Sequence, residues 1–114
     1  MQSYKNKLSK IIIEFYSKNQ NEAFYKMQKL YEQYPDDIEI NKIYGKMALK
    51  LNESQKAIKC FNYILSQISN DKEILEASYK LLINLGKFEE ALIKIDKLLQ
   101  IENKNFNYIK DKAF

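Results

Sequence analysis

The sequence predicts an all-α fold made of three similar helix pairs, and three observations favour it. Apolar residues recur with the 3.6-residue period of amphipathic helices along most of the chain. The pattern itself repeats every 34 residues, as shown by Ala23, Ala57 and Ala91. The 114 residues include only two glycines and one proline, which is too few for a β fold rich in turns.

The second helix of each pair carries the clearest repeat. Apolar residues follow each of the three alanines one, four, seven and eight positions later. This spacing places them on one face of a helix, and the small alanine marks where a neighbouring helix comes close. The repeated positions are Phe24, Ile58 and Leu92; Met27, Phe61 and Ile95; Leu30, Ile64 and Leu98; and Tyr31, Leu65 and Leu99.

Residues typical of helix ends stand between these segments. Asn52 and Gly86 lie where the first helix of a pair should end, and both residue types tolerate the left-handed conformation found there. Asn19 is expected to do the same in the first pair, with a turn one residue shorter. Asp37 and Asp71 should begin the next helices, where the helix dipole favours acidic groups. The predicted helices are 3–18, 20–34, 36–51, 53–68, 71–85 and 87–101, followed by a short amphipathic one at 106–113.

Helix pairs repeating at this period resemble tetratricopeptide (TPR) repeats. The best match is LGKFEEAL, from Leu85 to Leu92, and Gly45 and Pro35 fall on the family's small residue and closing proline. Tyr79 departs from the pattern in the third repeat. The resemblance implies an α-solenoid with repeats at about 4–37, 38–71 and 72–105, in a single domain 1–114 closed by the last helix. Pentatricopeptide RNA readers compete less well, because their repeat is one residue longer.

The resemblance also implies that the first helices line a concave groove. Lys42, Lys46 and Lys50 follow at intervals of four on one helix face, and Lys80 is the repeat equivalent of Lys46. We therefore expect an adaptor or scaffold that binds an acidic partner peptide at a mixed set of basic and apolar residues. This set is Lys42, Lys46, Lys50, Lys80, Tyr16, Leu49 and Ile83. In the alternative, these lysines are simply solvated.

One TPR ligand, the C-terminal carboxylate of heat-shock chaperones, is disfavoured. The family's clamp of Lys, Asn and Arg would fall here on residues such as Ile43, Glu73 and Ala77, which cannot hold a carboxylate. The clamp type of chaperone co-factor is therefore not expected.

Composition argues against an enzyme, a metal site or a cofactor. The chain has no histidine and one cysteine, Cys60, which shares its repeat position with Lys26 and Lys94 and is expected to be partly exposed. The carboxylate pairs at Asp36–Asp37 and Glu89–Glu90 fit helix starts better than acid–base catalysis. The longest apolar run, Ile11–Ile13, is far too short to span a membrane, and with no signal peptide apparent we expect a cytoplasmic protein.

Two other readings stay open. The formal charge of +4 is compatible with weak nucleic-acid binding, although the lysines are interleaved with acidic residues and there is no arginine to read bases. The chain could instead self-associate through an open C-terminal face, or be a capped fragment of a larger TPR protein. A second possible interface for self-association is a convex surface formed by Tyr4, Tyr25, Tyr34 and Tyr63.

Overall fold

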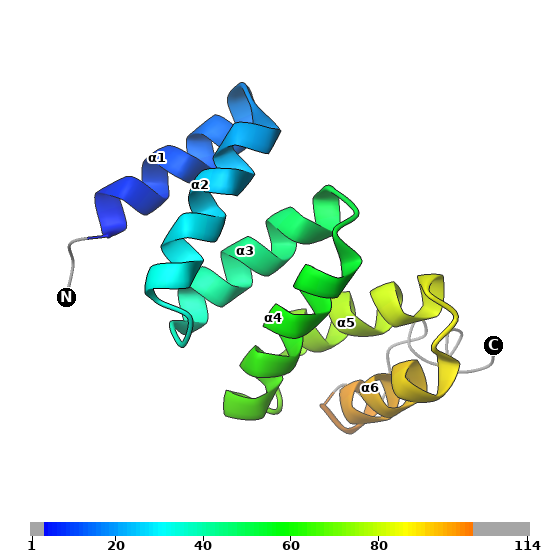
Figure 1. The fold of residues 1–114 in the computed structure, drawn as a ribbon. Helices are drawn as coiled ribbons and strands as arrows, with labels where there is room; N and C mark the ends of the chain where they lie inside the picture. The colour runs from blue at the N-terminus through cyan, green and yellow to red at the C-terminus, as the bar shows by residue number, and fades with distance from the viewer. Residues whose placement is uncertain (1–3, 102–114) are drawn as a thin grey trace. The chain divides into compact units, whose positions relative to one another are not determined.

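The computed structural model describes residues 4–101, and every regular element in this range is an α-helix (Figure 1). Each helix end lies within two residues of its predicted position, which confirms the all-α prediction. The short helix predicted at 106–113 falls outside the described residues. The helices are α1 (Lys5–Ser17), α2 (Gln20–Gln33), α3 (Ile38–Lys50), α4 (Ser54–Gln67), α5 (Lys72–Asn84) and α6 (Phe88–Ile101).

The chain divides into two compact units, with the boundary in α4 between Ala57 and Ile58. In the first unit, α1 packs on α2 and α2 packs on α3; in the second, α5 packs on α6. Consecutive helices of the first unit reverse direction at short turns (Figure 1). The single domain spanning 1–114 stays a prediction.

Burial follows the same 34-residue repeat as the sequence. Ala23, Ala57 and Ala91 are each 0% exposed, as expected where a small side chain lets two helix backbones approach. Burying a large apolar side chain stabilises a fold by about 1.5–3 kcal/mol. The large apolar residues at equivalent positions of the repeats therefore supply most of the stability of the core. The residues four and seven positions after the alanines are also buried: Met27, Phe61 and Ile95, and Leu30, Ile64 and Leu98.

Each unit buries one tyrosine in the first helix of a repeat, but the two tyrosines differ by one position within the repeat. In α3 the pair is Tyr44–Gly45, and in α5 the equivalent pair is Ser78–Tyr79. Tyr44 stacks between Phe24 and Tyr31 of α2, with ring centroids 5.1 and 4.9 Å away. Tyr79 belongs to the core cluster against which Ile58 and Leu65, the repeat equivalents of Phe24 and Tyr31, pack. The departure at Tyr79 therefore moves the aromatic ring by one residue and keeps its packing role.

Helices α3 and α5 end in the same hydrogen-bonded turn. Asn52 and Gly86 adopt left-handed conformations, with φ of 61° and 75°, as predicted. In both turns the following N–H donates to a carbonyl five residues earlier, from Glu53 to Ala48 and from Lys87 to Leu82, which is the Schellman arrangement. Because their C-terminal caps match, the two helices are joined to α4 and α6 by turns of the same form.

The prediction for Asn19 is wrong in its details. Only two residues, Lys18 and Asn19, separate α1 from α2, so the turn is one residue shorter than the other two, as expected. Asn19 is extended (φ −118°) and caps the start of α2, because its side-chain oxygen accepts a hydrogen bond from the Glu22 N–H. The shorter turn leaves no room for a left-handed residue before the next helix.

Aspartates begin α3 and α5 as expected. The side chain of Asp37 accepts a hydrogen bond from the Ile40 N–H at 2.9 Å, and that of Asp71 accepts one from the Ile74 N–H at 3.2 Å. A buried amide strengthens the first of these turns: Asn41 Nδ2 donates to the carbonyls of Pro35 and Asp37 at 2.9 and 2.8 Å. Its repeat equivalent is Leu75, so this polar contact belongs to α3 alone.

The start of α1 is tied to the start of α3. The Tyr4 hydroxyl donates to Asp37 Oδ2 at 2.5 Å, and Lys5 forms an ion pair with Glu39 at 3.3 Å. The hydrogen bond to Asp37, with smaller effects of burial and nearby carboxylates, raises the pKa of Tyr4 to about 12. The protonated Tyr4 hydroxyl thus helps to hold the start of α1 against the start of α3.

Replacing Gly86 with alanine should lower the free energy of unfolding by about 1 kcal/mol, because an L-residue disfavours this positive φ. No atom lies within 4 Å of the added Cβ, so the cost comes from the backbone and not from a clash. Urea unfolding followed by circular dichroism measures it. The exposed Asn62→Ala change is the control, and equal stability of the two variants would contradict the prediction.

Replacing Asn41 with leucine should lower the free energy of unfolding by about 1 kcal/mol, because the carbonyls of Pro35 and Asp37 lose the amide that donates to them. The change copies Leu75, the residue that the repeat places here in α5. Asn62→Leu, at an exposed site on α4, serves as the comparison. A variant at position 41 as stable as the wild type would show that this hydrogen bond contributes no net stability.

The pKa of Tyr4 should fall from about 12 towards 10 in the Asp37→Asn variant. Asparagine keeps the cap of α3 but removes the charge that holds the phenol proton. The folded pKa is raised, so this contribution to stability is complete below about pH 10 and is lost as the pH rises towards 12. NMR titration of the Tyr4 ring measures the shift, and an unchanged pKa in the variant would contradict it.

Candidate protein-binding surface

The predicted lysine stripe lies along α3 in the first unit. Lys42 and Lys46 are half-buried and Lys50 is exposed. A half-buried lysine packs its methylene stem on apolar neighbours while its ammonium group reaches towards water. Leu49, also half-buried, is next to Lys50 in the chain.

Tyr16 is the one predicted residue of α1, and the structure brings it to the end of this stripe. Its side chain is 61% exposed, and the Lys50 ammonium lies 5.9 Å from the centre of its ring. At this distance a cation is attracted to the face of the ring. Tyr16 also packs edge-on against the buried Phe15, with ring centroids 5.1 Å apart. An exposed aromatic ring is therefore held beside a cation.

The remaining predicted residues, Lys80 and Ile83, lie on α5 in the second unit. Lys80 is exposed, as a binding residue would be. Ile83 is half-buried and packs against the core cluster of its own unit, so part of its apolar surface is already covered.

The expectation for Cys60 is wrong. Cys60 is 1% exposed, and burial raises the pKa of its thiol to about 12, so it is not a partly exposed thiol. Of the four tyrosines of the possible second interface, Tyr25 is exposed and the other three are half-buried, so that interface stays a prediction. Tyr4 and Tyr34 are half-buried against each other, with ring centroids 5.1 Å apart.

The structure has a basic pocket between α1 and α2 that could not be predicted from the sequence alone. Lys7 and Lys10 on α1, and Lys26 and Lys29 on α2, line it together with Ile11 and Glu14. The lysines of each helix are three residues apart and so lie on one face. That spacing is visible in the sequence, but only the pairing of the two helices shows that the two faces meet.

Other chemistry is sparse in the described part of the chain. Within residues 4–101, no group of three or more cysteine and acidic side chains is placed to hold a metal ion. Glu89 and Glu90 lie in the first turn of α6 and are exposed, as predicted. None of the described helices is both long enough and apolar enough to cross a membrane.

Comparison with known proteins finds the fold and not a close relative. No family model and no curated protein matches the chain. A solved structure of MamA (AMB-1) matches 91% of it with a TM-score of 0.84 and 14% sequence identity. A tetratricopeptide repeat protein from Parabacteroides merdae matches 97% of it with a TM-score of 0.72 and 20% identity.

The chain spans 57% of the MamA structure and 40% of the Parabacteroides protein. At such low identity the likeness concerns the backbone arrangement, and binding residues have to be argued from this chain itself. The six helices of residues 4–101, their 34-residue repeat and these two matches agree with one another. The chain therefore has the TPR-like fold of the helical-repeat solenoids.

Proposed function

We propose that this chain is a protein-binding adaptor that takes up an acidic segment of its partner over the lysine stripe of α3. Helical-repeat folds present rows of exposed helix side chains, and in such folds binding is the usual role of those rows. The charge of the stripe and the aromatic ring at its end indicate the chemistry of the segment.

The contact between Lys50 and Tyr16 is the observation that carries the proposal. A 61% exposed tyrosine has a large apolar surface in water, and the cation beside it stays exposed too. A partner carboxylate can pair with the Lys50 ammonium while an apolar side chain next to it covers the ring. Aromatic anchors rimmed by charged groups are typical of protein-binding sites.

Lys42 and Lys46 extend this site along α3. The spacing of four residues sets each lysine about one helical turn, close to 6 Å, from the next. An acidic segment lying along α3 could therefore meet a cation at each turn, with Leu49 as an additional apolar contact. We include Lys80 and Ile83 in the proposed set on the strength of the sequence repeat.

Peptides selected from a random display library should be rich in Asp and Glu, with an apolar residue among them. Lys46→Glu/Lys50→Glu should weaken their binding by roughly tenfold or more, because two attractive charge pairs become repulsive. Tyr16→Ala should weaken it as well. Fluorescence anisotropy with a labelled selected peptide measures both effects. The Lys80→Glu variant alone measures how much the second unit contributes to peptide binding.

Lys59→Glu/Lys87→Glu is the matched control, since it makes the same change in net charge at two exposed lysines of the second unit. An equal loss in this control would mean that only the overall charge matters. Selected peptides without acidic residues would overturn the proposal. So would a single-stranded oligonucleotide that binds more tightly than any selected peptide.

A further inference from the structure

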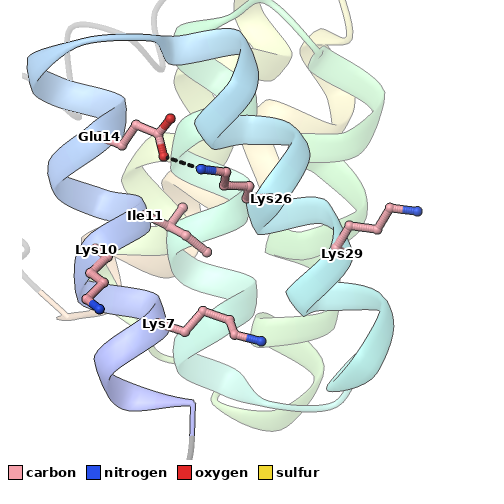
Figure 2. Close-up of a pocket in the computed structure, with 6 residues that line it drawn as sticks. All are labelled: Lys7, Lys10, Ile11, Glu14, Lys26 and Lys29. Atoms are coloured by element: carbon pink, nitrogen blue, oxygen red, sulfur yellow. Dashed lines mark hydrogen bonds and ion pairs between the residues drawn. The ribbon is translucent and has the colours of Figure 1, made fainter.

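The pocket between α1 and α2 concentrates positive charge around an apolar floor. It has a volume of about 380 Å³, and its lining includes four lysines but a single carboxylate, Glu14. Ile11, at its base, is 3% exposed and points between the two helices (Figure 2). The local balance of +3 is large beside the +4 of the whole chain.

One end of the pocket is closed by an ion pair. The Lys26 ammonium donates to Glu14 Oε1 at 3.0 Å, across the gap between α2 and α1 (Figure 2). This hydrogen bond raises the pKa of Lys26 and lowers that of Glu14, so both stay charged near neutral pH. The pair therefore fixes the position of one lysine and leaves the other three to set the net charge of the pocket.

The other end is open and basic. Lys7 reaches from α1 towards α2, and Lys10 lies below Ile11 on the same helix (Figure 2). Within the described residues, neither lysine has an ion-pair partner, and both are exposed. The Lys29 ammonium points away from α1 (Figure 2) and lies 5.1 Å from the centre of the Tyr25 ring, so it sits at the rim.

These groups select both the charge and the shape of a ligand. Lysine is a compact point charge suited to phosphate and carboxylate oxygens, and two or three of them favour more than one anionic group. Ile11 is almost fully covered, so the methylene stems of the lysines supply most of the apolar surface, which favours a flat apolar body above Ile11. The volume lies towards the lower end of the roughly 300–1,000 Å³ usual for small-molecule sites.

We propose that this pocket binds a compact organic polyanion, with a ring-sized body against the lysine stems above Ile11 and two or more phosphate or carboxylate groups held by Lys7 and Lys10. The site is independent of the proposed peptide-binding stripe, because it shares no residue with Lys42, Lys46 and Lys50. A phosphate-bearing ligand and a di- or tricarboxylate share the same recognition chemistry here.

Isothermal titration calorimetry with adenosine triphosphate, tripolyphosphate, citrate and adenosine tests the proposal. Adenosine triphosphate has both a ring and a polyanionic chain, and it should bind more tightly than tripolyphosphate or citrate, which have no ring. Adenosine, which has no anionic group, should not bind measurably. Citrate measured against tripolyphosphate shows whether carboxylates or phosphates are preferred.

Lys7→Glu/Lys10→Glu should weaken binding of adenosine triphosphate by roughly tenfold or more, because two exposed attractive charges become repulsive. Lys7→Gln/Lys10→Gln should weaken it less. Lys59→Glu/Lys87→Glu, which matches the charge change elsewhere, should leave it near the wild-type value. Both changed lysines are exposed, and circular dichroism verifies that each variant is folded.

Three results would overturn the proposal. Adenosine triphosphate could bind no better than tripolyphosphate, which would show that the apolar surface of the pocket does not contribute to binding. Its binding could survive charge reversal of Lys7 and Lys10. Finally, a Glu-rich peptide could bind this pocket, as judged by Lys7→Glu/Lys10→Glu, while adenosine triphosphate does not, which would make it a protein-docking site. Loss of peptide binding in the Lys46→Glu/Lys50→Glu variant bears on the proposed function alone.

Discussion

The packing of α1 on α2 and of α5 on α6 is the constraint on which the rest of this fold depends. Ala23 and Ala91 are completely buried in these pairs, and any larger side chain there would push two backbones apart. The distance between the helices of a pair decides which residues of the second helix reach the core. The same spacing brings Lys26 of α2 within 3.0 Å of Glu14 on α1, and so shapes the pocket between them.

A side chain can keep its packing role between repeats even where its position in the repeat differs by one residue. The buried tyrosine of α3 is the first of two adjacent residues, and that of α5 is the second, with a small neighbour in each case. Asn41 and Leu75 show the opposite case, in which equivalent buried positions do different work. The amide supports the turn before α3 by hydrogen bonds, whereas leucine joins the apolar cluster of the second unit.

Helix positions, the caps at Asn52 and Gly86 and the repeated core could be predicted from the sequence because each depends on local spacing. Asn19 could not, because losing one residue from a turn changes which helix the asparagine caps. Cys60 could not either, since its repeat equivalents Lys26 and Lys94 are not buried and burial depends on everything packed around α4. For the candidate surface, the sequence placed the α3 lysines on one face, but the contact of Lys50 with Tyr16 depends on how α1 and α3 are held.

The burial of Cys60 has a practical meaning for studying this chain. It is the chain's single thiol, and at 1% exposure a thiol reagent cannot reach it while α4 is packed. The rate at which such a reagent labels the native protein therefore reports how often that helix unfolds locally. A built-in reporter of local unfolding sits in the helix that the boundary between the two compact units crosses.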